Sequence, residues 1–179
     1  MLLTNRMAFV LLLSALLGGC AATVKKTGDE TPIKVGADAT KAIVLSMTGS
    51  NKDVTEAKDW ESFKGIWREA LQEEATAIGA TFENQEGGPK PTGKPGTLLA
   101  VDVADYRLIS VGARVGLGIM TGNAYVKAHV TFRDLNTGAA WGDRQYDTSS
   151  TTWQGVFSPM TDKQVRAICK EMVSTLSEH

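Results

Sequence analysis

The feature that most constrains the fold of this sequence is a strict alternation of apolar and polar residues in "AYVKAHVTFRDL", residues 124–135. One set of positions is apolar: Ala124, Val126, Ala128, Val130 and Phe132. The intervening set is polar or amphipathic: Tyr125, Lys127, His129, Thr131 and Arg133. Because successive side chains of a strand point to opposite faces, this pattern predicts a strand in a sheet that is covered on one side only.

Two stretches have the spacing of amphipathic helices that could cover such a sheet. Residues 55–78 are predicted to form the first helix, with apolar residues at intervals of three and four: Trp60, Phe63, Trp67, Leu71 and Ile78. Gly79 is expected to end this first helix.

The second helix starts after Pro159 and ends near Leu176. Cys169 falls on its apolar stripe, which predicts a small buried hydrophobic residue rather than a nucleophile. In the first helix, Trp60 and Trp67 are predicted to be core residues rather than a sugar-binding platform.

Further β-rich runs occupy residues 41–47, 80–84, 97–108 and 139–150, and Asn136-Thr137-Gly138 predicts a hairpin turn before the last of them. Residues 85–96, rich in proline and glycine, are predicted to be a loop. The element order is then strand, helix, strand, three strands and helix. It predicts an α+β fold, a two-layer sandwich of a mainly antiparallel sheet with two helices on one face.

The N-terminus carries the most specific targeting signal. Arg6 precedes an apolar run, residues 7–17, that is about half the roughly 20 residues of a transmembrane helix. Leu17-Gly18-Gly19-Cys20 resembles the lipobox of bacterial lipoproteins. That resemblance implies cleavage between Gly19 and Cys20 and a covalent lipid on Cys20. Ala21, in place of the aspartate that retains many lipoproteins at the inner membrane, favours the outer membrane. An ordinary secretory signal with a chance cysteine is the alternative.

Three segments follow from this interpretation: a signal peptide at 1–19, lipidated Cys20 with a flexible tether at 20–38, and a single α+β domain at 39–179. The 179 residues contain 19 basic and 20 acidic side chains. This balance offers no basic stripe, so nothing in the sequence favours nucleic acid as a partner.

A glycine-rich stretch, "RVGLGIMTGN", separates two predicted strands. A dinucleotide-binding fingerprint needs a helix directly behind its glycines, and a membrane-spanning hairpin needs longer alternation than this segment has. Two interpretations remain. The preferred one is a glycine-bent connection between strands. The other is an interface loop for a partner, formed by Gly116, Leu117, Gly118, Ile119 and Gly122.

Residues for catalysis are few. The chain has two histidines, His129 and His179, and no nucleophile-elbow motif. Asp102, Asp105 or Asp143 could supply a carboxylate pair for glycoside cleavage, but their separation cannot be derived from the sequence. No spacing typical of a metal site is present. The sequence therefore predicts a protein that is not an enzyme and has no metal or cofactor apart from the lipid on Cys20.

The second half carries a family resemblance. From Leu98 to Leu176, "VGARVGLGIMTGNAYVKAHVTFRDLNTGAAW", "GVFSPMTDKQV" and the final helix resemble an uncharacterised family of bacterial envelope lipoproteins. Its members share a glycine-rich segment, a strand ending in D-x-x-T-G, here Asp134 to Gly138, and a C-terminal helix. The general plan also resembles small α/β lipoproteins that regulate cell-wall synthesis or build secretion assemblies, which is an analogy of fold alone.

These resemblances imply an outer-membrane-anchored lipoprotein with its domain in the periplasm. The expected function is a non-catalytic binding or assembly module of the cell envelope, with an envelope protein or a second copy of itself as partner. The alternative function is a cell-wall hydrolase or an activator of a cell-wall enzyme. An enzyme would need a concave cluster of titratable groups, whereas an assembly module needs a flat or grooved surface.

Overall fold

The computed structural model describes residues 24–27, 32–108, 123–149 and 160–177. Within them, six strands form one sheet: β1 (Val24–Thr27), β2 (Ala42–Gly49), β3 (Thr81–Gln85), β4 (Thr97–Arg107), β5 (Tyr125–Asp134) and β6 (Ala140–Ser149). The helices are α2 (Lys52–Thr55), α3 (Trp60–Ala77) and α5 (Met160–Ser177).

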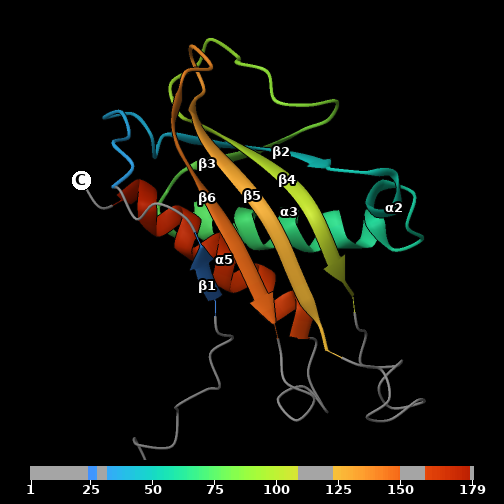
Figure 1. Ribbon diagram of the computed structural model, residues 1–179. Coiled ribbons are helices and arrows are strands. Elements are labelled where there is room, and N and C mark those ends of the chain that lie inside the picture. The colour runs from blue at the N-terminus through green and yellow to red at the C-terminus, as the bar shows by residue number, and fades with distance from the viewer. Residues whose placement is uncertain (1–23, 28–31, 109–122, 150–159, 178–179) are drawn as a thin grey trace, which may run out of the picture.

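The sheet is mixed, with the strand order β1-β6-β5-β4-β2-β3. The pairs β1–β6, β6–β5 and β5–β4 are antiparallel, whereas β2 is parallel to both β4 and β3. The two long helices, α3 and α5, lie side by side on one face of this sheet (Figure 1). The predicted α+β fold, with a mostly antiparallel sheet, is therefore confirmed.

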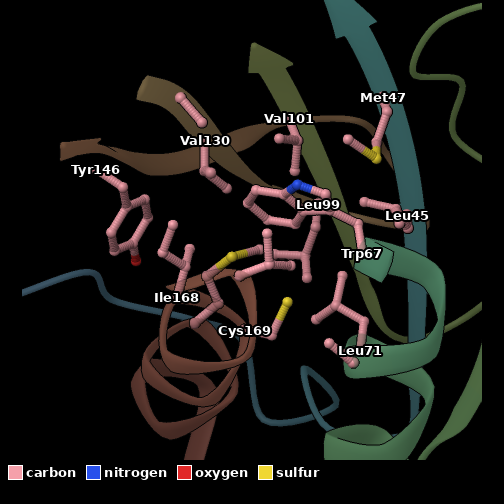
Figure 2. Packing of buried hydrophobic residues seen from close by; sticks show 14 of the residues in the cluster. Leu45, Met47, Trp67, Leu71, Leu99, Val101, Val130, Tyr146, Ile168 and Cys169 are labelled. Carbon is pink, nitrogen blue, oxygen red and sulfur yellow. The ribbon is translucent and has the colours of Figure 1, made fainter. Parts of the chain in front are cut away.

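The hydrophobic core lies between the sheet and the two long helices. The apolar side chains predicted to share one face, from Ala124 just before β5 to Phe132 within it, are buried. Trp67 of α3 is fully buried between the strands and α5, near Leu99, Val130 and Cys169 (Figure 2). The prediction that Trp67 and Cys169 are core residues is confirmed, and a sugar-binding role for Trp67 is ruled out by its burial.

An arginine links the two long helices on their outer side. Arg166 of α5 binds Asp162 of the same helix, with Nε to Oδ2 at 3.1 Å, and reaches Glu69 and Glu73 on α3. The Arg166 to Glu69 contact measures 3.2 Å. One guanidinium thus contacts carboxylates of both helices, but the glutamates are exposed, so these contacts add only modestly to the packing of the two helices.

The first helix begins later than its spacing predicts. Asn51 accepts a hydrogen bond from the Val54 N–H at 3.1 Å and starts the separate short helix α2. Helix α3 then begins at Trp60 and not at residue 55. Ile78 was predicted to lie on the apolar stripe, but it follows the last turn of α3 and is 37% exposed. Gly79 does end the helix, with φ of +75°.

The predicted tether is partly wrong. Residues 24–27, expected to be flexible, form β1, which pairs with β6 from Val24↔Thr148 to Thr27↔Gln145. Ile33, further along the same segment, is buried and packs in the main core. The sequence gives little sign of β1 because edge pairing depends on backbone groups and does not require an apolar alternation. The domain therefore begins before residue 39.

Gly96, at the start of β4, offers a test of the backbone geometry. Its φ is +146°, and an added Cβ would lie 2.4 Å from the carbonyl oxygen of Ala42. We expect Gly96→Ala to lower the free energy of unfolding by about 2–4 kcal/mol, because strain and a backbone clash add together. Gly87→Ala is the matched control: Gly87 has φ of +77° with nothing near its Cβ position, and should cost only about 1 kcal/mol. Equal losses in urea titrations of the two variants would contradict the close approach.

Candidate functional site: the open sheet face and the hollows at its ends

On the side away from the long helices, the sheet carries a small buried apolar cluster near the β5–β6 turn, formed by Val44, Leu98 and Leu135, and a polar surface beyond it. The strand registers place Thr48, Asp102, His129 and Gln145 in one row across β2, β4, β5 and β6. Thr131 and Asp143 lie opposite each other in the neighbouring row. This surface, called the open face below, is the polar side that the alternation in β5 predicts.

The titratable residues of the open face form separate small contacts. Ser50 Oγ donates to Asp102 Oδ2 at 2.7 Å, and Thr48 Oγ1 donates to Asp102 Oδ1 at 3.2 Å. His129 Nε2 lies 2.9 Å from Asp143 Oδ2. Asp102 thus contacts hydroxyl groups, whereas His129 contacts a different carboxylate. These contacts do not form the serine–histidine–aspartate chain that activates a serine nucleophile.

Asp105, the third carboxylate considered for glycoside cleavage, lies apart from the other two. It follows a β-bulge in β4 and accepts a hydrogen bond from Tyr125 Oη at 3.2 Å. Burial, followed by the nearby Asp105 charge, raises the pKa of Tyr125. In the part of the chain that the structure describes, no three histidine, cysteine or acidic residues gather in a group that could hold a metal.

The contact between His129 and Asp143 is exposed, with 42% and 60% of the two side chains accessible. Exposed pairs contribute about 0–1 kcal/mol, because water and salt screen them. We expect a double-mutant cycle with His129→Ala and Asp143→Ala to give a coupling free energy within this range. A coupling of several kcal/mol would indicate a buried, functionally coupled pair and would contradict the description of the open face as a solvated surface.

Cys169 is placed in the core, where its side chain is fully buried. Burial raises the pKa of the Cys169 thiol, which keeps it in the unreactive protonated form. We therefore expect no alkylation of Cys169 by iodoacetamide at pH 8 in the folded protein and rapid alkylation in urea. Mass spectrometry of the peptide that contains Cys169 measures both. Rapid modification of the folded protein would contradict this packing.

Two neighbouring hollows lie at the end of the sheet near the β5–β6 turn. The first, with a volume of about 400 Å³, is called the Trp141 hollow and is lined by Gly36, Ala37, Asp38, Ala39, Gly93, Pro95, Gly96, Asp134, Asn136 and Trp141. A neighbouring groove of about 620 Å³ shares Gly36, Ala37 and Ala39 with it and continues along Val35, Thr40, Ile78, Leu176 and Ser177. Neither the hollow nor the groove was predicted from the sequence, because their lining residues come from segments far apart in the chain.

The D-x-x-T-G motif forms the β5–β6 turn beside the Trp141 hollow. Asp134 Oδ1 accepts the backbone N–H of Asn136 at 2.7 Å and that of Thr137 at 3.2 Å. Gly138 adopts φ of +80° and donates its N–H to the Asp134 carbonyl oxygen. The motif is thus explained by the geometry of the turn, in which an aspartate caps backbone N–H groups and glycine takes the left-handed conformation.

The predicted lipidation, cleavage and interface residues lie outside the described residues: Gly19, Cys20, Gly116, Leu117, Gly118, Ile119 and Gly122. They stay predictions. The described residues on either side of residues 109–122, Leu108 and Asn123, lie at the end of the sheet where β1 begins, since Arg107 pairs with Tyr125 and Val24 pairs with Thr148. None of the described helices has the length and apolar character needed to cross a membrane.

Comparison with known proteins gives similarity of structure only. No family model and no curated protein matches the chain. The PelC dodecamer from Paraburkholderia phytofirmans is similar at a TM-score of 0.52 and 16% identity, covering 88% of this chain and 99% of PelC. A dodecamer of a PelC variant from the same organism, with one leucine replaced by methionine, gives a TM-score of 0.50 at 16% identity, with 87% of this chain and 96% of that chain covered.

A weaker likeness links the chain to protein XCC0632 from Xanthomonas campestris, of family DUF330. Its TM-score is 0.46 at 11% identity, with 85% of this chain and 90% of that chain covered. At these identities the likeness to PelC shows the fold alone: this chain shares the fold of PelC over nearly the full length of both proteins.

Proposed function

We propose that this protein is a non-catalytic binding and assembly module of the bacterial cell envelope. It is held at the outer membrane by a lipid on Cys20, with the domain in the periplasm, and it associates with further copies of itself. The observation that carries the proposal is the open face: around the rows of Asp102 with His129 and Thr131 with Asp143, neighbouring strands present polar side chains that no described helix covers.

The arrangement of the open face supports binding rather than chemistry. Its carboxylates, Asp102 and Asp143, have different partners, and Asp105 is paired with Tyr125. Catalysis by paired carboxylates or by a nucleophile requires groups that converge on one reacting atom. A broad surface with separate polar contacts suits a partner that covers many side chains at once.

The position of β1 supports a short link to the membrane. Val24 is four residues after Cys20, so the two Cα atoms are at most about 14 Å apart. A lipid on Cys20 would therefore hold the end of the sheet where β1 begins close to the bilayer. Leu108 and Asn123 belong to the same end, while the Trp141 hollow lies at the opposite end.

The likeness to PelC supports self-association, because both similar PelC structures are dodecamers. Assembly of many copies by head-to-tail contacts would use two different surfaces of each copy, and the sheet supplies different edges in β1 and β3 as well as the open face. Identity is low, so the number of copies is not carried over from PelC.

Photocrosslinking in intact cells tests which face binds. A benzoylphenylalanine is placed at Gln145 on the open face or, as the matched control, at Gln72 on the outer side of α3; both side chains are exposed. We expect irradiation to give an adduct of this chain with itself from Gln145 and none from Gln72. Adducts from Gln72 alone, or from neither position, would contradict a role for the open face.

A further inference from the structure

We propose that the Trp141 hollow binds a sugar residue of a glycan. The site depends only on described residues and goes beyond the proposed function, since it requires neither the lipid nor self-association. Its volume of about 400 Å³ falls in the range of small-molecule sites, roughly 300–1,000 Å³.

The hollow is kept open by residues without side chains. Gly36, Gly93 and Gly96 all line it, and backbone conformation demands glycine at two of them, with φ of +76° at Gly93 and +146° at Gly96. A Cβ on Gly36 would lie 3.4 Å from Trp141 Cζ2, so the indole ring lies directly beside this backbone segment. The result is a recess with one large aromatic wall and short surrounding chains.

Trp141 supplies the apolar contact that a sugar ring needs. It is half-buried and packs against the main core, which holds the indole in place while leaving part of it accessible. The face of an aromatic ring carries partial negative charge and attracts the weakly positive C–H groups on one side of a pyranose. Pro95 adds a second rigid apolar surface to the lining.

Three side chains supply hydrogen-bonding groups for hydroxyls: Asp38, Asp134 and Asn136. Both aspartates already have partners on part of their carboxylate, but neither partner removes the negative charge from the hollow. Asp38 pairs with Lys41 at 2.8 Å, and Asp134 Oδ1 accepts two backbone N–H groups. These contacts leave further carboxylate lone pairs as acceptors. A carboxylate, an amide and an aromatic ring that line one recess are the groups that bind the hydroxyls and the C–H face of a sugar. Because an aromatic ring and carboxylates also attract cations, a cationic probe is included in the test.

The test uses the full-length chain with ¹⁵N-labelled tryptophan, in a detergent that has no sugar head group. The chain has four tryptophans, and Trp141→Phe identifies the indole N–H signal of Trp141. The probes are tetrasaccharides of β-1,4-linked glucose and of β-1,4-linked N-acetylglucosamine, with trilysine as the cationic probe. We expect at least one tetrasaccharide to shift the Trp141 signal saturably, and trilysine to leave it unchanged.

Variants locate the binding within the hollow. Trp141→Ala should weaken binding of the active tetrasaccharide at least about tenfold by calorimetry. Asp134→Asn should weaken it several-fold while keeping the turn, because asparagine retains the oxygen that accepts the backbone N–H groups. Ile78→Ala, in the neighbouring groove, is the matched control and should leave affinity unchanged. Binding of trilysine instead, no shift with either tetrasaccharide, or an equal loss in Ile78→Ala would overturn the proposal.

Discussion

Replacing Trp67 by alanine is expected to lower the free energy of unfolding by about 3–5 kcal/mol, the range for emptying a buried aromatic site. Trp67 is fully buried at the place where α3, α5 and the sheet meet (Figure 2). Its ring contacts Phe63 edge-on at a centroid distance of 6.3 Å. Removal of the indole therefore leaves a cavity bordered by both layers of the sandwich.

Trp67→Phe distinguishes the effect of losing ring volume from the effect of losing the indole N–H group. The Trp67 Nε1 atom is buried with no hydrogen-bond partner among the described residues. Phenylalanine keeps most of the ring and removes the unpaired N–H group, so its cost should be clearly smaller than that of alanine. Urea denaturation followed by far-UV circular dichroism measures both variants. A midpoint for Trp67→Ala within experimental error of the wild-type value would place Trp67 at the surface and contradict the fold.

Replacing Cys20 by serine is expected to remove the protein from the outer-membrane fraction. Serine cannot carry the thioether-linked lipid, and the proposed attachment depends on acyl chains rather than on a transmembrane segment. Flotation of membranes in a density gradient, followed by immunoblotting, measures the distribution of the chain. Cys169→Ala is the matched control because it removes the other cysteine, which is buried. Outer-membrane flotation of Cys20→Ser at the wild-type level would make the lipoprotein interpretation wrong.

Regular spacing made much of the fold predictable. Apolar residues recur at every second position in β5 and at intervals of three and four in α3 and α5. The structure confirms that each of these patterns marks a buried face. Prediction failed where local contacts compete with spacing. Asn51 caps a separate turn ahead of α3, and the helix ends before Ile78, so that this apolar residue is exposed.

The candidate sites differ in how much of them the sequence contains. A lipobox is a local pattern, so Cys20 can be proposed from adjacent residues alone. The Trp141 hollow, in contrast, joins residues 36–39, 93–96, 134–136 and Trp141, which come together only through the sheet order. No spacing along the chain links these segments. The pairing of β1 with β6 was missed for a related reason, since it is made by backbone groups of residues more than one hundred positions apart.

The mass of the full-length chain extracted from outer membranes in mild detergent tests whether this protein is an outer-membrane module that associates with itself. Light scattering coupled to size-exclusion chromatography, corrected for bound detergent, gives the mass of the protein component. We expect one discrete species in the outer-membrane extract, with a protein mass that equals two or more protomers. A protein that is monomeric at every concentration, or that is absent from the outer-membrane fraction, would contradict the proposed function.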